Sequence, residues 1–514
     1  MTTPLTGSVD VLTIIALILA AVATVAVGAY VGRRSRTTSD FLVASRTVGS
    51  PWNAAAISGE YLSAASFLGV AGLVAKYGAD ALWYPIGFTA GYLGLLLFVA
   101  APLRRSGAYT VPDFAEFRLR SRAARMAAMV VVVLICVLYL IPQLQGAGLT
   151  LNILLGAPVW VGVVAVGAIV IVNVVGGGMR SITFVQAFQY WLKLTAIAVP
   201  TLVLTAVFFR RHPDPDAIAA LNAQWAEPGH GLGGDHALFQ VLSLIVATFM
   251  GTMGLPHVLV RFYTNPDGRQ ARRTALSVIV LLSIFYLFPT LLGTFARIHV
   301  PQLLISDTAD AAVLLLPGAA VGGVTGQFLA ALIAAGAIAA FLATSSGLLV
   351  SVAGALATDV LPGRVRDFRV AAVIAGVLPI GLALAATSLE LSRTVGLVFA
   401  VSASTLCPLL VLGIWWRGLT AAGAIAGLVV GGVSSGAATS ISIAGGIGGV
   451  QLSGWPATIL GYPAAVTVTL AFATMIGVSV LTRSQMPADV ARTFARMHVP
   501  ERVGMGIERL PRDD

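Results

Sequence analysis

Long runs of apolar residues follow one another along almost the whole chain. A run of roughly 20 apolar residues crosses the hydrocarbon core of a bilayer as one α-helix. The alternating ten-residue segments that are typical of a membrane β-barrel do not occur in the sequence. We therefore predict an all-α polytopic membrane protein with about 13 transmembrane helices. These are expected near residues 9–31, 51–75, 80–101, 125–153, 157–176, 182–209, 237–258, 274–299, 323–357, 369–387, 394–416, 420–441 and 457–481.

The first apolar run does not have the layout of a cleaved signal peptide. Residues 1–10 carry no Lys or Arg, and the run from 11 to 31 is followed by Arg33, Arg34 and Arg36. A signal peptide has its positive charge first and a shorter apolar core. We therefore predict a retained first helix with its N-terminus outside.

The basic residues are distributed very unevenly between the two sets of loops. Positively charged residues are enriched in the cytoplasmic loops of membrane proteins. With an external N-terminus, the loops predicted inside hold 25 of the 31 basic residues, Arg261 among them, whereas the outside loops hold Lys76, Arg210, Arg211, Arg297 and Arg393. We therefore expect a multi-pass protein of the inner (plasma) membrane with a cytoplasmic C-terminus.

Composition narrows the possible functions. Hydrophobic residues make up 58% of the chain and charged residues 10%, against about 25% charged in a soluble domain. This excludes a soluble enzyme or a nucleic-acid binder, and we interpret the net charge of +10 as a topology signal. Cys136 and Cys407 both lie in apolar stretches, so we expect no disulfide framework and no metal cluster. No Walker motif and no clustered nucleophile and base occur, so transport driven by an ion gradient is favoured over an ATP-driven pump or a membrane enzyme.

Two crossings contain Gly and polar residues near their middle. The second reads ISGEYLSAASFLG at 57–69, and the seventh reads FMGTMGLPH at 249–257. Paired interruptions at corresponding positions of two halves indicate an inverted-repeat transporter, although small residues can also serve only to pack helices closely. We predict an N-terminal helix and loop (1–50), a first five-helix repeat (51–209), an external loop (210–236), a second repeat (237–416), two further helices (417–481) and a cytoplasmic tail (482–514).

Two charged residues lie deep in crossings. Glu60 is the acidic one, and a charge at the centre of a membrane helix costs about 2.5–3.5 kcal/mol. It is a candidate for cation or proton handling, or a protonated side chain that is hydrogen-bonded between helices. Lys193 could extend its ammonium toward the interface, pair with Glu60 or attract an anion, and we favour a structural or pairing role.

Three consecutive hydroxyl residues, Thr344, Ser345 and Ser346, lie near the middle of the ninth crossing. Hydroxyl and carbonyl oxygens are the ligands that a hard cation such as sodium requires. The alternative is that these hydroxyls bond to the preceding turn of their own helix.

Several of these stretches resemble the sodium:solute symporter family, and most closely its cation/acetate (monocarboxylate) branch. The resemblance is carried by the segment 57–69, by GTMGLPHVLVRFYT at 251–264 and by GGMRS at 177–181. The shorter motifs YTVPDF at 109–114 and TDVL at 358–361 agree with it.

The resemblance implies a five-plus-five inverted-repeat core of the leucine-transporter type that works by alternating access. It also implies a sodium ion between the first and the eighth helix of that ten-helix core, which are the second and the ninth crossing of this chain. The matching positions are the carbonyls of Gly59, Leu62 and Ala340 and the hydroxyl of Thr344. Ala343 stands where the family has a second hydroxyl, and Ser345 is its possible substitute. The coupling ion is therefore expected to be sodium, or a proton through Glu60, and no other cofactor is expected.

Helix N-termini inside the membrane expose free N–H groups that suit a carboxylate, and Pro256 fits the first position of such a helix. We therefore expect uptake of a short monocarboxylate such as acetate, propionate or pyruvate. The alternatives are another small solute on the same scaffold, such as proline or a sugar, or a passive channel. A monomer in the lipid bilayer is expected to suffice, and we expect no nucleic-acid partner. The candidate substrate-binding residues are Tyr61, Ser63, Gly251, Gly254, Leu255, Pro256 and His257.

The predicted topology can be tested by labelling single cysteines at Thr3 and Asp513, with Cys136 and Cys407 replaced by alanine. An odd number of crossings places the two labels on opposite faces of the membrane. A membrane-impermeant maleimide should therefore react with position 3 from outside and with position 513 only from inside. Reaction of both positions from the same face would contradict the count of thirteen.

Overall fold

The computed structural model describes residues 11–32, 44–211, 221, 223–229, 236–301, 309–361, 365–385, 391–443 and 452–500. Within these ranges the chain forms helices and no strand, as the sequence predicts. Arg33, Arg34 and Arg36, as well as most of the predicted external loop 210–236, lie outside the described residues.

The N-terminal half contains helices interrupted at several points. They are α1 (Val11–Gly32), η1 (Ala44–Arg46), α3 (Ser50–Tyr61), η2 (Ala65–Gly69), α4 (Val70–Tyr77), η3 (Gly78–Leu82), α5 (Trp83–Gly94), η4 (Leu95–Val99), α6 (Ala100–Arg105), α7 (Val111–Leu119), α8 (Arg122–Leu155), α9 (Val159–Arg211) and α11 (Ala223–Ala226).

The C-terminal half continues with α12 (Ala237–Gly254), α13 (Pro256–Tyr263), α14 (Gly268–His299), η6 (Ala309–Ala311), α15 (Ala312–Ala320), α16 (Gly323–Asp359), α17 (Val365–Ala385), α18 (Leu391–Ser404), α19 (Leu406–Trp415), α20 (Ala421–Ile443), α21 (Gly454–Gly461), α22 (Ala464–Leu481), η7 (Arg483–Gln485) and α23 (Val490–His498).

The predicted count of thirteen crossings is not confirmed. In the described residues, 11 helical runs are long and apolar enough to span a membrane. The two longest, Ala65–Arg105 with 41 residues and Val159–Arg210 with 52 residues, have at least twice the roughly 20 residues of a single crossing. Each contains a glycine with positive φ, Gly78 (φ 60) and Gly178 (φ 56), at which regular helix geometry is lost.

The predicted interruption in the second crossing is confirmed. Helix α3 ends at Tyr61, and Leu62 has a non-helical backbone with ψ 80. The N–H of Ser63 donates to the carbonyl of Tyr61 at 2.8 Å. In a continuous helix that N–H would donate to Gly59, so the carbonyl of Gly59 is released. After the break, Ala64 N donates to Gln143 Oε1 on α8 at 3.1 Å.

The predicted interruption in the seventh crossing is also confirmed. Helix α12 ends at Gly254, Leu255 is extended with ψ 116, and Pro256 opens α13. Proline suits this position because its missing N–H would have no partner in the first turn of a helix. The two breaks place main-chain groups that lack helical partners inside the predicted membrane segments.

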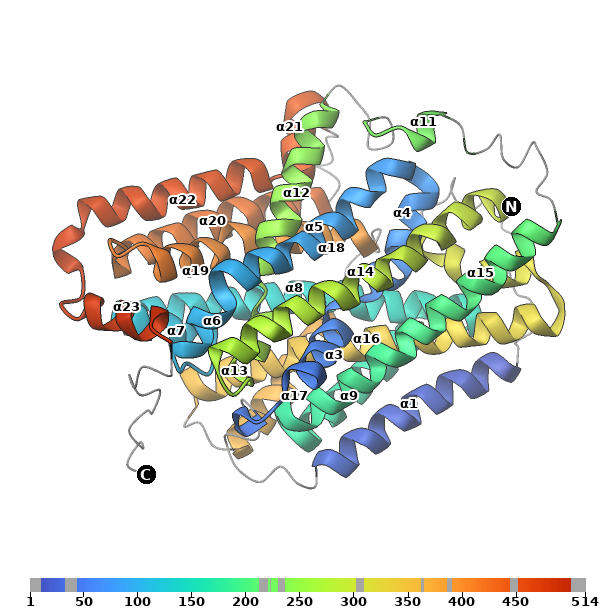
Figure 1. The fold of residues 1–514 in the computed structure, drawn as a ribbon, viewed down its shortest axis with the longest axis horizontal. Coiled ribbons are helices and arrows are strands. Elements are labelled where there is room, and N and C mark those ends of the chain that lie inside the picture. Colours follow the sequence, from blue (N-terminus) through green and yellow to red (C-terminus); the bar gives the residue numbers. More distant parts are fainter. Residues whose placement is uncertain are drawn as a thin grey trace.

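The interrupted helices pack at the centre of the molecule. Helix α16 packs against α9 and α8, and α3 packs against α9 and contacts α16 and α13. Figure 1 shows α3 and α16 near the middle of the bundle, α13 toward the end that carries α7, and α1 at the edge. Helices α20 and α22 pack against each other beside α12 and α18. The centre of the bundle is therefore built from segments of both predicted repeats.

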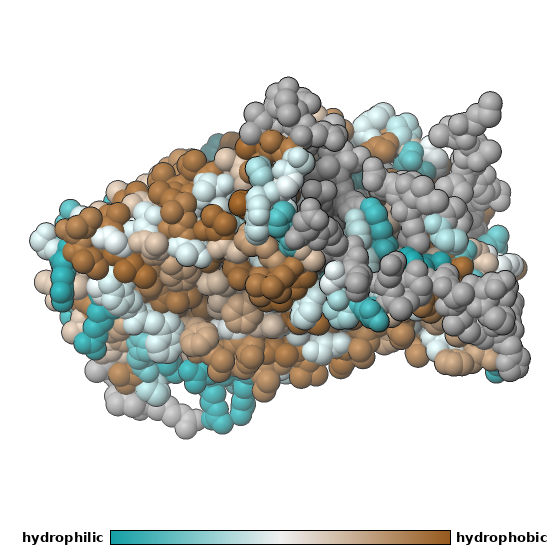
Figure 2. Space-filling model, turned by 90° about the horizontal axis from the view of Figure 1, so that it is seen from above, coloured by the Kyte–Doolittle hydropathy of each residue, from teal (hydrophilic) through white to brown (hydrophobic). Residues whose placement is uncertain are grey.

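The outer surface is largely apolar, as expected for contact with lipid. Exposed large hydrophobic side chains occur on helices from α1 to α22, among them Leu19, Val172, Leu242, Leu287 and Leu470. Figure 2 shows hydrophobic residues over much of the described surface, with hydrophilic residues gathered toward the ends. This pattern matches a helical bundle that lies within a bilayer.

Arginines from the loops predicted inside meet at one end of the molecule, around α7 and α23. Arg120 pairs with Asp489 at 2.5 Å, and Arg125 pairs with Asp359 at 2.5 Å. Burial lowers the pKa of Arg118 to about 10, and the hydrogen bond from Arg120 holds the pKa of Asp489 below its usual value. Helix α11 lies near the opposite end (Figure 1). The sequence segments predicted to share one side of the membrane thus lie together.

Valine at Gly254 should destabilise the fold more than valine at Gly477. A Cβ at Gly254 would lie 2.7 Å from the carbonyl oxygen of Ser402, whereas nothing lies within 4 Å of a Cβ at Gly477. Overpacking of this kind costs about 1–3 kcal/mol. The melting temperature of the purified protein in detergent measures the difference. Equal losses for the two variants would contradict the close packing at the second break.

Candidate functional site

A buried ion pair joins the two interrupted helices. Arg261 Nε on α13 donates to Glu60 Oε2 on α3 at 2.6 Å, and both side chains are 1% exposed. A glycine makes room for the carboxylate, because a Cβ at Gly347 on α16 would clash with the Glu60 side chain. The pair therefore holds the first half of the chain against the second at the level of the breaks.

The prediction that Arg261 lies in an internal loop is wrong. Its guanidinium is buried and donates to Thr183 Oγ1 at 2.7 Å and to Gln186 Oε1. Asn53 Nδ2 on α3 donates to the main-chain oxygen of Arg261 at 2.9 Å. These contacts fix α13 to both α3 and α9 around one charged group.

Lys193 on α9 donates hydrogen bonds to the main chain at the break that follows α3. Its ammonium donates to the carbonyl oxygen of Leu62 at 2.8 Å and also to that of Gly59, and the residue is fully buried. These are the two first-helix carbonyls that the resemblance assigns to sodium. A cation thus already contacts both oxygens, and it is a side chain of the protein.

The predicted ligands on α16 lie at the same level. Thr344 Oγ1 donates to the main-chain oxygen of Glu60 at 2.5 Å, so its hydroxyl reaches across to α3 and does not bond back to its own helix. Ala343 presents a methyl group, and its carbonyl accepts from Gln186 Nε2 at 2.8 Å. Ser345 Oγ is buried without a hydrogen-bond partner in the described part of the chain. Ala340 is fully buried.

Tyr61 links the two breaks directly. Its phenol lies 2.7 Å from Thr252 Oγ1, at the end of α12, and also donates to the carbonyl of Phe88 at 3.2 Å. The rings of Tyr92 and Phe399 pack edge-on against Tyr61, with centroids 4.9 and 6.2 Å away. The candidate site thus has aromatic walls and polar groups at the two helix ends.

Several buried polar atoms beside the breaks have no partner within the described residues. They include both ring nitrogens of His257, the hydroxyls of Ser58, Ser63 and Tyr92, and Glu60 Oε1. Tyr139 lies beside His257, with ring centroids 5.5 Å apart. Buried polar groups normally find a hydrogen-bond partner, so this set is suited to a polar ligand.

The other candidate substrate-binding residues line the second break. Gly251 and Gly254 allow α12 to approach α18 closely, since a Cβ at Gly251 would lie 2.5 Å from the carbonyl oxygen of Phe399. Leu255 and Pro256 form the break itself and are buried. The structure therefore brings the candidate substrate-binding residues to the two breaks, while their roles in binding stay predictions.

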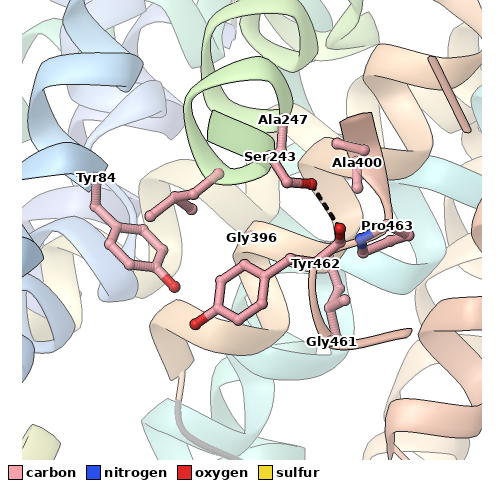
Figure 3. Close-up of a pocket in the computed structure, with 11 residues that line it drawn as sticks. Tyr84, Ser243, Ala247, Gly396, Ala400, Gly461, Tyr462 and Pro463 are labelled. Carbon is pink, nitrogen blue, oxygen red and sulfur yellow. Dashed lines mark hydrogen bonds between the residues drawn. The ribbon is translucent and has the colours of Figure 1, made fainter. Parts of the chain in front are cut away.

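A small cavity lies away from the breaks. Tyr84 on α5, Ser243 on α12, Gly396 on α18 and Tyr462 line a space of about 20 Å³, roughly enough for one water molecule. Figure 3 shows the rings of Tyr84 and Tyr462 pointing into this space, and Ser243 bonded to the carbonyl of Tyr462. It is too small for a monocarboxylate.

Sequence reasoning missed Gln186 and misplaced Arg261. Gln186 bonds to both Arg261 and Ala343, but a single glutamine in an apolar crossing has no distinctive spacing. Arg261 lies just past residue 258, where the seventh crossing is predicted to end, although Pro256–Tyr263 forms a buried helix. A signal was present, because Glu60 needed a cationic partner and few basic residues lie in the crossings.

Comparison with known proteins gives one family. A model of the sodium:solute symporter family matches residues 41–431. A protein of Bacillus subtilis (strain 168) named Uncharacterized symporter YwcA is 33% identical over 504 residues, which is 93% of this chain and 96% of that protein. The Monocarboxylic acid transporter of Corynebacterium glutamicum is 33% identical over 518 residues, covering 93% of this chain and 92% of that protein.

Two solved structures share the fold. A Na+-coupled sialic acid symporter, in a substrate-bound outward-open state, aligns with a TM-score of 0.70 and 17% identity over 91% of this chain and 98% of its own. Mhp1, a nucleobase-cation-symport-1 family transporter in a closed conformation with bromovinylhydantoin bound, aligns with a TM-score of 0.52 and 14% identity over 89% of this chain and 98% of its own. The predicted leucine-transporter-type fold is thereby confirmed.

Glu60→Gln should destabilise the protein far more than Asp489→Asn. Removing one partner of a buried ion pair costs about 3–5 kcal/mol, because the other charge is left uncompensated. An exposed pair such as Arg120–Asp489 contributes about 0–1 kcal/mol. Melting temperatures in detergent compare the two, and Glu60→Gln/Arg261→Met should regain part of the loss. A Glu60→Gln variant as stable as Asp489→Asn would contradict the buried pair.

Proposed function

The chain belongs to the sodium:solute symporter family, and from this premise we propose that it takes up a short monocarboxylate, such as acetate, propionate or pyruvate, together with an inward-moving cation. The members and fold relatives found by comparison are transporters. The family supports sodium as the coupling ion, and a proton is the alternative.

The unpartnered buried polar groups at the two breaks carry the proposal. His257 is the second residue of α13, and neither of its ring nitrogens has a partner in the described chain. Free N–H groups at the start of a helix favour negative charge. A carboxylate at this position gains donors from the helix end and from His257.

The charges around the breaks also favour an anion. Glu60 and Arg261 compensate each other at 2.6 Å, whereas the Lys193 ammonium contacts only neutral carbonyls in its two hydrogen bonds. These three side chains together carry a net charge of +1. Because an uncompensated charge is costly in a low-dielectric interior, a bound monocarboxylate would balance it.

The surrounding side chains favour a small substrate. Aromatic rings at Tyr61, Phe88, Tyr92 and Phe399 pack against one another, which leaves polar contacts at one end and apolar walls elsewhere. This suits a carboxylate with a short tail better than a sugar, whose hydroxyls require several polar partners. The name of the Corynebacterium relative agrees with this substrate class.

Alternating access supplies the mechanism that we propose. The breaks let α3 change its angle to η2–α4, and α12 its angle to α13, because the segment between the half-helices lacks continuous hydrogen bonding. The inward cation gradient drives the cycle, and a tenfold gradient of a singly charged ion supplies about 1.4 kcal/mol. We place the N-terminus outside and the C-terminus in the cytoplasm.

Counterflow of labelled acetate in proteoliposomes tests the substrate class. We expect acetate to exchange and unlabelled propionate or pyruvate to compete, because each offers one carboxylate and a short tail. Proline and glucose should not compete, since a zwitterion or a polyol does not match a single anionic site. Counterflow of labelled proline, with no exchange of labelled acetate, would assign the protein to the alternative substrate class.

A further inference from the structure

Lys193 occupies an unusual place for a charged side chain. It is fully buried, and its ammonium bonds to the carbonyls of Gly59 and Leu62. The Gly59 oxygen is available because Ser63 N bonds to Tyr61 instead. The break in α3 thus creates an oxygen site that a cation can fill, and the ammonium of α9 fills it.

A second cation would be repelled by this ammonium. The charged groups that face the position are Glu60 on α3 and its partner Arg261 on α13, so the single carboxylate is already neutralised. Like charges a few ångströms apart repel strongly in a low-dielectric interior. A sodium ion at the two carbonyls would therefore require the ammonium to leave.

The oxygen set on α16 is also poor for sodium. Ala343 contributes no side-chain oxygen where the resemblance expects a second hydroxyl, and its carbonyl accepts from Gln186, which leaves the hydroxyls of Thr344 and Ser345 as the side-chain oxygens. The geometry at α16 is independent of the position of Lys193. The ammonium at the two carbonyls and the oxygens on α16 therefore lead to the same conclusion, that the site holds Lys193 and no sodium.

We propose that Lys193 is a tethered cation that takes the place of sodium at the carbonyls of Gly59 and Leu62, so that this chain binds no sodium there. Lys193 thereby determines ion specificity at the first break. The inference deepens the proposed function and rests on it only in treating the chain as a cation-coupled carrier. A coupling ion, whether sodium or a proton, binds away from these carbonyls.

Sodium-dependent thermal stability tests this assignment without any substrate. The purified protein in detergent is unfolded in sodium chloride and in an equal concentration of N-methyl-D-glucamine chloride. A ligand that binds the folded state raises the melting temperature. Lys193→Ala frees the carbonyls, so this variant should gain a sodium-dependent rise over the parent, and Lys193→Ala/Ala343→Ser should gain a larger one. Adding Thr344→Ala should abolish the gain.

The other lysine of the chain provides the matched control. Lys76 lies at the end of α4, away from the breaks, so Lys76→Ala should respond to sodium as the parent does. Folded Lys193→Ala variants that respond no more than the parent would overturn the proposal. Should these variants fail to fold, the sodium-dependent melting temperature of the single variant Thr344→Ala tests the proposal. Its sodium response should equal that of the parent, and loss of a parental response would show that sodium uses this site despite Lys193. Neither outcome depends on which solute is transported.

Discussion

A broken helix inside a membrane needs donors for its released main-chain oxygens, and the centre of this protein is organised around that need. No water from the lipid side can satisfy such groups, and each unsatisfied one costs several kcal/mol. At the break in α3, Lys193 donates to Gly59 and Leu62, and Thr344 donates to Glu60. Helices α9 and α16 are thus bound to α3 by the groups that its break exposes.

The same arrangement explains the charges at the centre. An ammonium that satisfies carbonyls introduces a positive charge, and Glu60 cannot balance it because Arg261 already does so at 2.6 Å. The result is a positively charged, aromatic-walled region between two half-helices. The anion binding that we propose and the contact between the two halves of the chain both follow from a few side chains that meet at the breaks.

The helical class and the positions of both breaks could be predicted from the sequence, but the side chains that pair at the breaks could not. Apolar runs gave the helical class, and Gly, polar residues and Pro256 located both breaks, because these residue types weaken or end helices locally. The pairing of Glu60 was harder to predict. Lys193 was one candidate partner, whereas Arg261 was assigned to a loop because it lies just past residue 258, the predicted end of the seventh crossing. Hydropathy describes burial against lipid, and it cannot separate an exposed arginine from one enclosed by protein.

An experimental structure of the protein purified in sodium chloride would test the central claim most directly. We expect density for the Lys193 ammonium within hydrogen-bond distance of the carbonyl oxygens of Gly59 and Leu62, with α3 broken after Tyr61. An ion bound to those two oxygens, with the Lys193 side chain turned away, would contradict the account.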